Sequence, residues 1–210
     1  MTFFQYPTSN KNFEIPKKLI HGTTSKGVLS ILRSKIQERG YNALGIQNPP
    51  SSRDFGDGFY CSLDNSICQN QVFIRAKSKA DSFEDELVSP VIIGIQVNQQ
   101  INKDSDLRCL YFDGRLEVDG LQWAEYIAFH RVMKDKKFCI NDPCVGHPDI
   151  IIGPVADGNA ITTYSHQAYN GDISIDKFYS VITQSNWFPD YKQYVFSQRA
   201  IKYLNPVLKL

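Results

Sequence analysis

Apolar residues in this chain form several short continuous runs, which predict strands. The clearest run covers residues 91–97 and consists mainly of valine and isoleucine, as expected of a buried strand. Shorter runs of the same kind predict strands over 15–21, 59–62, 108–112, 149–154 and 193–197. The last of these lies close to the C-terminal end of the sequence.

Other segments carry their apolar residues at the 3.6-residue spacing of an amphipathic helix. One helix is predicted after Thr24 or Ser25, either of which can cap it, with Gly40 as its stop. Further helices are predicted over 121–133, after a cap at Ser174, and over 200–204. Residues 67–86 predict a mixed segment followed by an exposed loop or helix edge. Residues 41–57 predict a long loop, whose length suggests a functional flap.

Helices and strands are interspersed along the chain, but the strands are short and their connections irregular. This pattern favours an α+β fold over a doubly wound parallel sheet. The length of 210 residues suits a single domain with a full core, so we predict one domain over 1–210 with 1–14 as a loose lead.

Composition and charge do not favour duplex DNA or a membrane surface as a partner. The chain has 23 Lys and Arg against 22 Asp and Glu, so its net charge of +1 provides no strong reason to expect duplex DNA or a membrane surface. No segment approaches the roughly 18 apolar residues of a membrane helix. Five cysteines without a secretory leader predict reduced thiols in a soluble cytoplasmic protein.

Candidate metal ligands are few. Cys139, Cys144 and His147 lie close together in the sequence, but no fourth ligand stands at a usable spacing. We therefore predict that the protein holds no metal.

Two motifs suggest a pocket for nicotinamide, a flat ring that carries a carboxamide. His21-Gly22-Thr23 closes the first predicted strand, and a glycine there lets the backbone approach the carboxamide closely. His21 can hydrogen-bond a neighbouring ribose hydroxyl. The second motif, 54–60, brings Phe59 and Tyr60 into the next strand, where an aromatic face can stack on the ring. The two motifs, in this order and with a predicted helix between them, are more specific than either alone.

These motifs resemble those of ADP-ribosyltransferases of the diphtheria toxin and poly(ADP-ribose) polymerase branch. That branch carries a histidine, a tyrosine and usually a glutamate on three strands, and the third strand resembles 193–196 here. The chain is also similar to an uncharacterised bacterial family of this kind, through Asp54 to Tyr60, Trp123 to Arg131 and Asp149 to Asp157. The resemblance spans about 15–204 and implies a split mixed sheet with flanking helices.

The resemblance also implies roles for individual residues. His21 would hold a ribose of NAD, Gly22 would pair with the carboxamide through its backbone, and Tyr60 would stack on the nicotinamide. Further cofactor contacts are expected from neighbouring residues of the two motifs and the flap, namely Thr23, Arg53, Phe55, Gly58 and Phe59. Arg53 would meet the pyrophosphate.

The third position departs from the branch, because Gln193 stands where glutamate is usual. Nicotinamide departure develops positive charge on the ribose, which a carboxylate stabilises better than a neutral amide. The rival is Glu125 in Ala124-Glu125-Tyr126-Ile127, which copies the expected strand pattern but falls in a predicted helix. We place Gln193 ahead of Glu125 and keep both as candidate catalytic residues with His21 and Tyr60. Asp157 could orient Arg131 beneath the pocket.

The resemblance therefore predicts an NAD-dependent mono-ADP-ribosyltransferase whose acceptor is a macromolecule, either a nucleic-acid base or a protein side chain. Toxins, toxin–antitoxin systems and antiviral defence effectors are the family-level expectation, with RNA modification among their activities and a cognate antitoxin as a further partner. Two alternatives stay open. One is a binding module that holds NAD without turnover, and the other is an NAD glycohydrolase.

Overall fold

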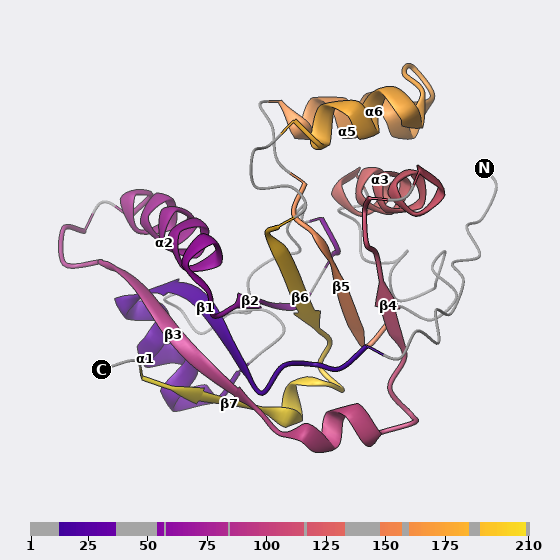
Figure 1. The fold of residues 1–210 in the computed structure, drawn as a ribbon. Coiled ribbons are helices and arrows are strands. Elements are labelled where there is room, and N and C mark those ends of the chain that lie inside the picture. The colour runs from indigo at the N-terminus through magenta and orange to yellow at the C-terminus, as the bar shows by residue number, and fades with distance from the viewer. Residues whose placement is uncertain are drawn as a thin grey trace.

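The computed structural model describes residues 13–36, 54–56, 58–83, 85–115, 117–132, 148–156, 160–184 and 190–208. Within these ranges the chain is a mixed α/β structure, with one seven-stranded sheet and five α-helices (Figure 1). The strands are β1 (Lys18–Thr24), β2 (Phe59–Leu63), β3 (Pro90–Val97), β4 (Cys109–Tyr111), β5 (Ile150–Pro154), β6 (Lys192–Phe196) and β7 (Leu204–Val207). The α-helices are α1 (Ser25–Ser34), α2 (Ser66–Asp81), α3 (Glu117–Val132), α5 (Ile161–Asn170) and α6 (Ile175–Ile182), and the short 3-10 helices are η1 (Gln99–Lys103) and η2 (Ile201–Tyr203).

The sheet is mixed, as a chain of interspersed helices and strands predicts. Its strand order is β4-β5-β6-β2-β1-β3-β7. Every neighbouring pair is antiparallel except β4 and β5, which run parallel. Strand β6, which comes late in the chain, therefore lies between β5 and β2, near the middle of the sheet.

The ladder between β1 and β2 is short, and this divides the sheet. β1 pairs with β3 from Lys18 to Thr24, but its register with β2 contains only Leu19↔Leu63 and Ile20↔Ser62. From His21 onward β1 continues beside β3 while β2 continues beside β6 (Figure 1). The register between β1 and β2 therefore ends at Ile20, and beyond it the two strands diverge toward β3 and β6.

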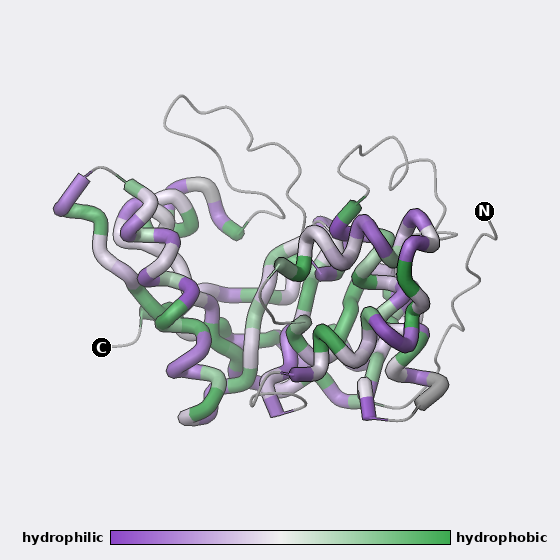
Figure 2. The backbone as a smooth tube through the Cα atoms, turned by 90° about the horizontal axis from the view of Figure 1, so that it is seen from above, coloured by the Kyte–Doolittle hydropathy of each residue, from purple (hydrophilic) through white to green (hydrophobic). Residues whose placement is uncertain are grey.

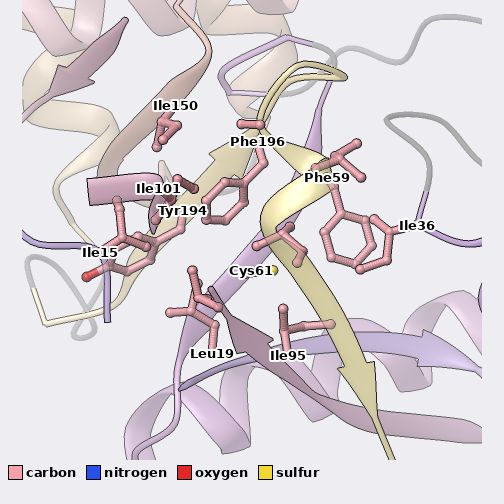
Figure 3. Close-up of a cluster of buried hydrophobic side chains, with 14 of the residues drawn as sticks. Ile15, Leu19, Ile36, Phe59, Cys61, Ile95, Ile101, Ile150, Tyr194 and Phe196 are labelled. Atoms are coloured by element: carbon pink, nitrogen blue, oxygen red, sulfur yellow. The ribbon is translucent and has the colours of Figure 1, made fainter. Parts of the chain in front are cut away.

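Hydrophobic side chains pack on both faces of the sheet. One face carries Leu19, Phe59, Cys61, Ile95, Tyr194 and Phe196 in a single cluster, drawn in Figure 3. Helix α1 packs against this cluster, and α2 covers the opposite face of β1 and β3. On that opposite face, α3 packs over β4, β5 and β6, with α5 and α6 outside it. Figure 2 shows hydrophobic and hydrophilic residues alternating along the helices, as this layering requires.

Local capping explains where several helices begin. The Thr24 side chain accepts a hydrogen bond from the Gly27 backbone N–H at 3.2 Å, and Ser174 caps α6 in the same way through Lys177. Both caps are among those that the sequence predicts. Helix α1 ends at Ser34, however, before the predicted stop at Gly40, which lies outside the described residues.

Three other elements differ from the sequence prediction. Residues 66–81 form the continuous helix α2, capped by Asn65, rather than a mixed segment and loop. Helix α5 was not predicted at all. Strand β7 follows the short helix that was predicted near residue 200, and it contains Pro206 on the edge strand of the sheet, where a missing N–H is tolerated.

Candidate active site

His21 and Tyr60 meet where β1 and β2 part. The His21 ring nitrogen Nδ1 lies 2.7 Å from the Tyr60 carbonyl oxygen. A carbonyl oxygen only accepts hydrogen bonds, so Nδ1 carries the proton that it donates. In a neutral imidazole this leaves Nε2 as the acceptor atom, which suits a hydroxyl donor such as a ribose.

The Tyr60 hydroxyl ties β2 to the loop that precedes it. It donates to the Gly56 carbonyl at 2.7 Å and accepts from the Phe55 N–H at 3.2 Å. Gly56 has a positive φ of 72°, a conformation that glycine adopts without steric cost. The tyrosine ring therefore has a fixed position at the start of the strand. It is half-buried at the edge of the hydrophobic cluster that α3 forms with β4, β5 and β6.

Asp54, at the start of the same motif, is a buried carboxylate that joins four segments of the chain. Its Oδ1 accepts from Nε of Arg131 at 2.8 Å, and the two side chains form a salt bridge. Its Oδ2 accepts from the Ala156 N–H at 3.1 Å and from Nε2 of Gln193 at 2.9 Å. Only 5% of Asp54 is exposed, so each of these charge-assisted bonds lies largely out of water.

Gln193 and Tyr60 project from the same face of neighbouring strands. Tyr60 pairs with Val195 and Ser62 pairs with Gln193, and alternate residues of a strand share a face. Asp54 lies on this face because it accepts a hydrogen bond from the Gln193 side chain, and Arg131 lies there because it donates to Asp54. The structure thus brings together three of the sequence motifs at one place.

The His21 ring lies toward the other face. It stacks on Phe59, with 4.3 Å between ring centroids, and Phe59 precedes Tyr60 in the same strand, so the two side chains point to opposite faces. His21 and Tyr60 are therefore neighbours through the Tyr60 backbone rather than through facing side chains. A ligand that touched both would have to enter at the opening between β1 and β2.

Gly22 and Thr23 have packing partners of their own. A Cβ on Gly22 would lie 2.6 Å from the Val72 carbonyl oxygen, so α2 can approach β1 only because this residue is glycine. Thr23 is 2% exposed. Its hydroxyl lies beside Gly27 in the first turn of α1. This burial gives Thr23 a packing role, and its expected cofactor contact stays a prediction.

The aromatic residues of the second motif also contribute to the core. Phe55 is fully buried and packs on Phe112 and Tyr126, and its expected cofactor contact stays a prediction. Phe59 is 5% exposed and lies in the hydrophobic cluster drawn in Figure 3, where its described ring contact is with His21. Gly58 packs against β6, since a Cβ there would lie 2.3 Å from Val195 Cγ1.

The rival third residue, Glu125, lies on helix α3, as its spacing predicts. It is half-buried, and burial raises the pKa of its carboxyl above the ordinary value. Arg131 lies six positions further along the helix, which corresponds to about 120° around the helix axis and about 9 Å along it. Glu125 therefore projects away from the direction in which Arg131 reaches Asp54.

Tyr191, just before β6, borders the same face and was not singled out by the sequence. Burial raises the pKa of its hydroxyl, and a hydrogen bond to Ser62 acts in the opposite direction. The guanidinium of Arg75, on α2, lies 5.7 Å from the Tyr191 ring centroid. Ser62 is directly opposite Gln193 in the sheet, so α2 reaches the neighbourhood of Asp54 through these side chains.

Several residues that the sequence suggested lie outside the described ranges, namely Arg53, Asp157, Cys139, Cys144 and His147. Within those ranges no group of three or more His, Cys, Asp or Glu side chains could hold a metal ion. The helices of the described parts of the chain include none that is both long and apolar enough to cross a membrane.

The family model described as protein of unknown function (DUF3990) matches residues 41–205, which is more than half of the chain. The chain belongs to this family. The matched region contains Asp54, Tyr60, Arg131 and Gln193, whereas His21 precedes it. No curated protein and no solved structure matches the chain.

Proposed function

We propose that this DUF3990 protein is an NAD-dependent ADP-ribosyltransferase whose fold is of the split-sheet type found in that superfamily. The observation that carries the proposal is the meeting of His21 and Tyr60 at the point where β1 and β2 separate, with Gln193 on the adjoining strand. The motif order resembles that of the diphtheria toxin branch. The division of the sheet between β1 and β2 supports the same assignment.

In the proposed reaction the bond between the nicotinamide nitrogen and ribose C1′ breaks, and nicotinamide departs with the bonding electrons. A nucleophilic oxygen or nitrogen of the acceptor forms the new bond to C1′ and loses its proton to solvent or a nearby base. The backbone edge of β1 at Gly22 would pair with the carboxamide, and Tyr60 would stack on the ring. His21 Nε2 would accept from a ribose hydroxyl, and Gln193 would orient the 2-hydroxyl through its oxygen.

The proposed acceptor is a nucleic-acid base or a protein side chain, and a role as a toxin or antiviral defence effector in the cytoplasm, with a neutralising partner, follows from the resemblance. The direct test is incubation of the purified protein with NAD labelled on the adenylate and with cell lysate. Nicotinamide release together with label on a macromolecule supports transfer. Nicotinamide release without a labelled product indicates a glycohydrolase, and saturable NAD binding without release indicates a binding module.

Tyr60 provides the matched variants for this test. We expect Tyr60→Ala to lower nicotinamide release at least 100-fold, because the ring that would stack on nicotinamide is gone. Tyr60→Phe keeps the ring and loses the hydroxyl bonds to Phe55 and Gly56, so it should retain more than a tenth of the activity. Tyr203→Phe removes a tyrosine hydroxyl bond to Asp104 elsewhere in the protein and serves as the control. Full activity in Tyr60→Ala would refute the pocket.

A further inference from the structure

The amide of Gln193 is held by a buried carboxylate. Gln193 and Asp54 are 7% and 5% exposed, and Nε2 of Gln193 donates to Oδ2 of Asp54 at 2.9 Å. The same Oδ2 accepts from the Ala156 N–H, while Oδ1 accepts from Arg131. Both carboxylate oxygens of Asp54 therefore accept hydrogen bonds from other segments as well as from Gln193.

This contact fixes which end of the amide faces Asp54. An ionised carboxylate only accepts hydrogen bonds, so the NH2 group of Gln193 must point to it and the carbonyl oxygen must point away. No hydrogen bond to Oε1 is formed among the described residues. Oε1 is also not one of the polar atoms that are sealed from solvent without a partner. A ligand on this face would therefore meet the oxygen of the amide.

A glutamate at position 193 would be poorly matched to this environment. Its carboxylate would lie within hydrogen-bond distance of Asp54, in a buried place where Arg131 is the single cation bound to that carboxylate among the described residues. Two carboxylates at this distance cannot both stay ionised without a large penalty, so one of them takes up a proton. Glutamine has the same length but carries a neutral amide that donates to Asp54, so it avoids this electrostatic penalty.

We propose that Asp54 is a positioning residue that orients Gln193 and is the reason why the third position of this site is glutamine rather than glutamate. In this arrangement the negative charge is on Asp54, behind the Gln193 amide, whereas in a glutamate site it would be on the third residue itself. Asp54 polarises the amide through its N–H, which increases the negative charge on Oε1. For its effect on turnover, but not for the geometry, this inference rests on the proposed function.

The decisive test is a double-mutant cycle of Gln193→Glu and Asp54→Asn, followed by urea unfolding between about pH 5 and 8. The pKa of the introduced glutamate is expected to be raised in the folded state, so Q193E is penalised increasingly as pH rises above the ordinary Glu value near 4.3. The folding equilibrium constant of Q193E, relative to that of the unmodified protein, should fall by up to about tenfold per pH unit in this window. Gln193→Met, which removes the donor without adding charge, should show a loss that does not change with pH.

In the double variant the two groups exchange roles, because the amide introduced at position 54 can donate to the carboxylate introduced at position 193. The pH-dependent loss should then disappear. The described structure also places Arg131, Tyr60, Tyr191, Arg75 and Cys68 near this pair. Each pH slope is taken relative to that of the unmodified protein, so it reports on the carboxyl pair. Equal pH slopes for Q193E alone and for the double variant would overturn the proposal.

A variant that fails to fold does not prevent a decision. The side-chain amide resonances of Gln193, assigned by their loss in Gln193→Met, should shift in Asp54→Asn and lose their protection from hydrogen exchange. Unchanged resonances and protection in Asp54→Asn would overturn the proposal as well.

The turnover measurement separates this inference from the proposed function. With NAD as substrate, Asp54→Asn should lower kcat for nicotinamide release at least tenfold with a smaller change in KM, and adding Gln193→Glu should restore at least part of that loss. No recovery would overturn the positioning role in turnover. If the unmodified protein releases no nicotinamide, the proposed function fails, and the pH slopes still decide whether Asp54 determines the residue at 193.

Discussion

Gly153 lets the second motif reach the candidate site, and replacing it by alanine tests that packing. A Cβ at this position would lie 2.8 Å from Cζ of Phe55 and 3.2 Å from Cβ of Phe112. Real Cβ atoms do not approach as closely as the first distance, so the Phe55 ring would have to move. Phe55 directly follows Asp54, and its displacement would also pull on the carboxylate that holds Gln193.

The magnitude follows from the cost of overpacking a core, which is about 1–3 kcal/mol. For a chain of this size, 1 kcal/mol corresponds to about 2–4 °C in Tm, so Gly153→Ala should lower Tm by about 2–12 °C. Thermal unfolding followed by circular dichroism measures the change, and urea unfolding gives the free energy.

Phe55→Leu provides the matched background, because leucine lacks the ring tip that the new methyl group would meet. It has its own cost from the cavity that it leaves, but Gly153→Ala should add little to that cost. The expected coupling between the two positions is therefore about 1–2 kcal/mol. Equal losses from Gly153→Ala in the unmodified protein and in the Phe55→Leu background would show that the clash with the ring is not the cause, and the reasoning would fail.

Two further predictions concern titratable groups. Burial raises the pKa of Glu125, so its charged form is disfavoured in the folded protein. Glu125→Gln should therefore stabilise the protein as pH rises above about 4.5, with no gain at lower pH, and by less than about 1 kcal/mol because the residue is partly exposed. Urea unfolding at pH 4 and pH 7 checks the sign, and a larger gain at pH 4 would contradict it. Burial raises the pKa of the Cys61 and Cys68 thiols, and burial with the nearby charge of Asp149 raises the pKa of Cys109 to about 11. These three thiols should therefore react slowly with iodoacetamide at pH 8 until urea is added, and peptide mass spectrometry that finds any of them modified at the rate of a free thiol would refute this.

The strands with continuous apolar runs could be predicted from the sequence because their signal is local. Residues 150–154 are buried on both faces and most of 90–97 is buried or half-buried, and valine and isoleucine dominate in both strands. Helix α2 could not be predicted in the same way. Its buried positions are Cys68, Gln71, Val72, Ala76 and Ala80, a stripe of mostly small side chains, while the larger Phe73 and Ile74 face outward, so the apolar pattern is weak in the sequence. The small residues are required by the close approach of α2 to Gly22.

The candidate site was predictable in part. The motifs around His21 and Tyr60 place both residues at strand ends, and the structure brings them together at the opening between β1 and β2. The importance of Asp54 was not apparent, because its partners Arg131 and Gln193 are 77 and 139 positions away in the sequence. Ion pairs between distant segments leave no periodic trace in a single sequence. The position of Asp54 beside Phe55, in a motif that also holds Phe59 and Tyr60, was the one signal that could have suggested a buried, paired carboxylate.

The central position of β6 has a consequence for the synthesis of this protein. Residues 192–196 fill the place between β5 and β2, so the sheet cannot close before they have left the ribosome. Until then Asp54 lacks its amide partner and β2 has an open edge. A nascent chain whose residues 192–196 are still inside the ribosome therefore lacks the assembled candidate site.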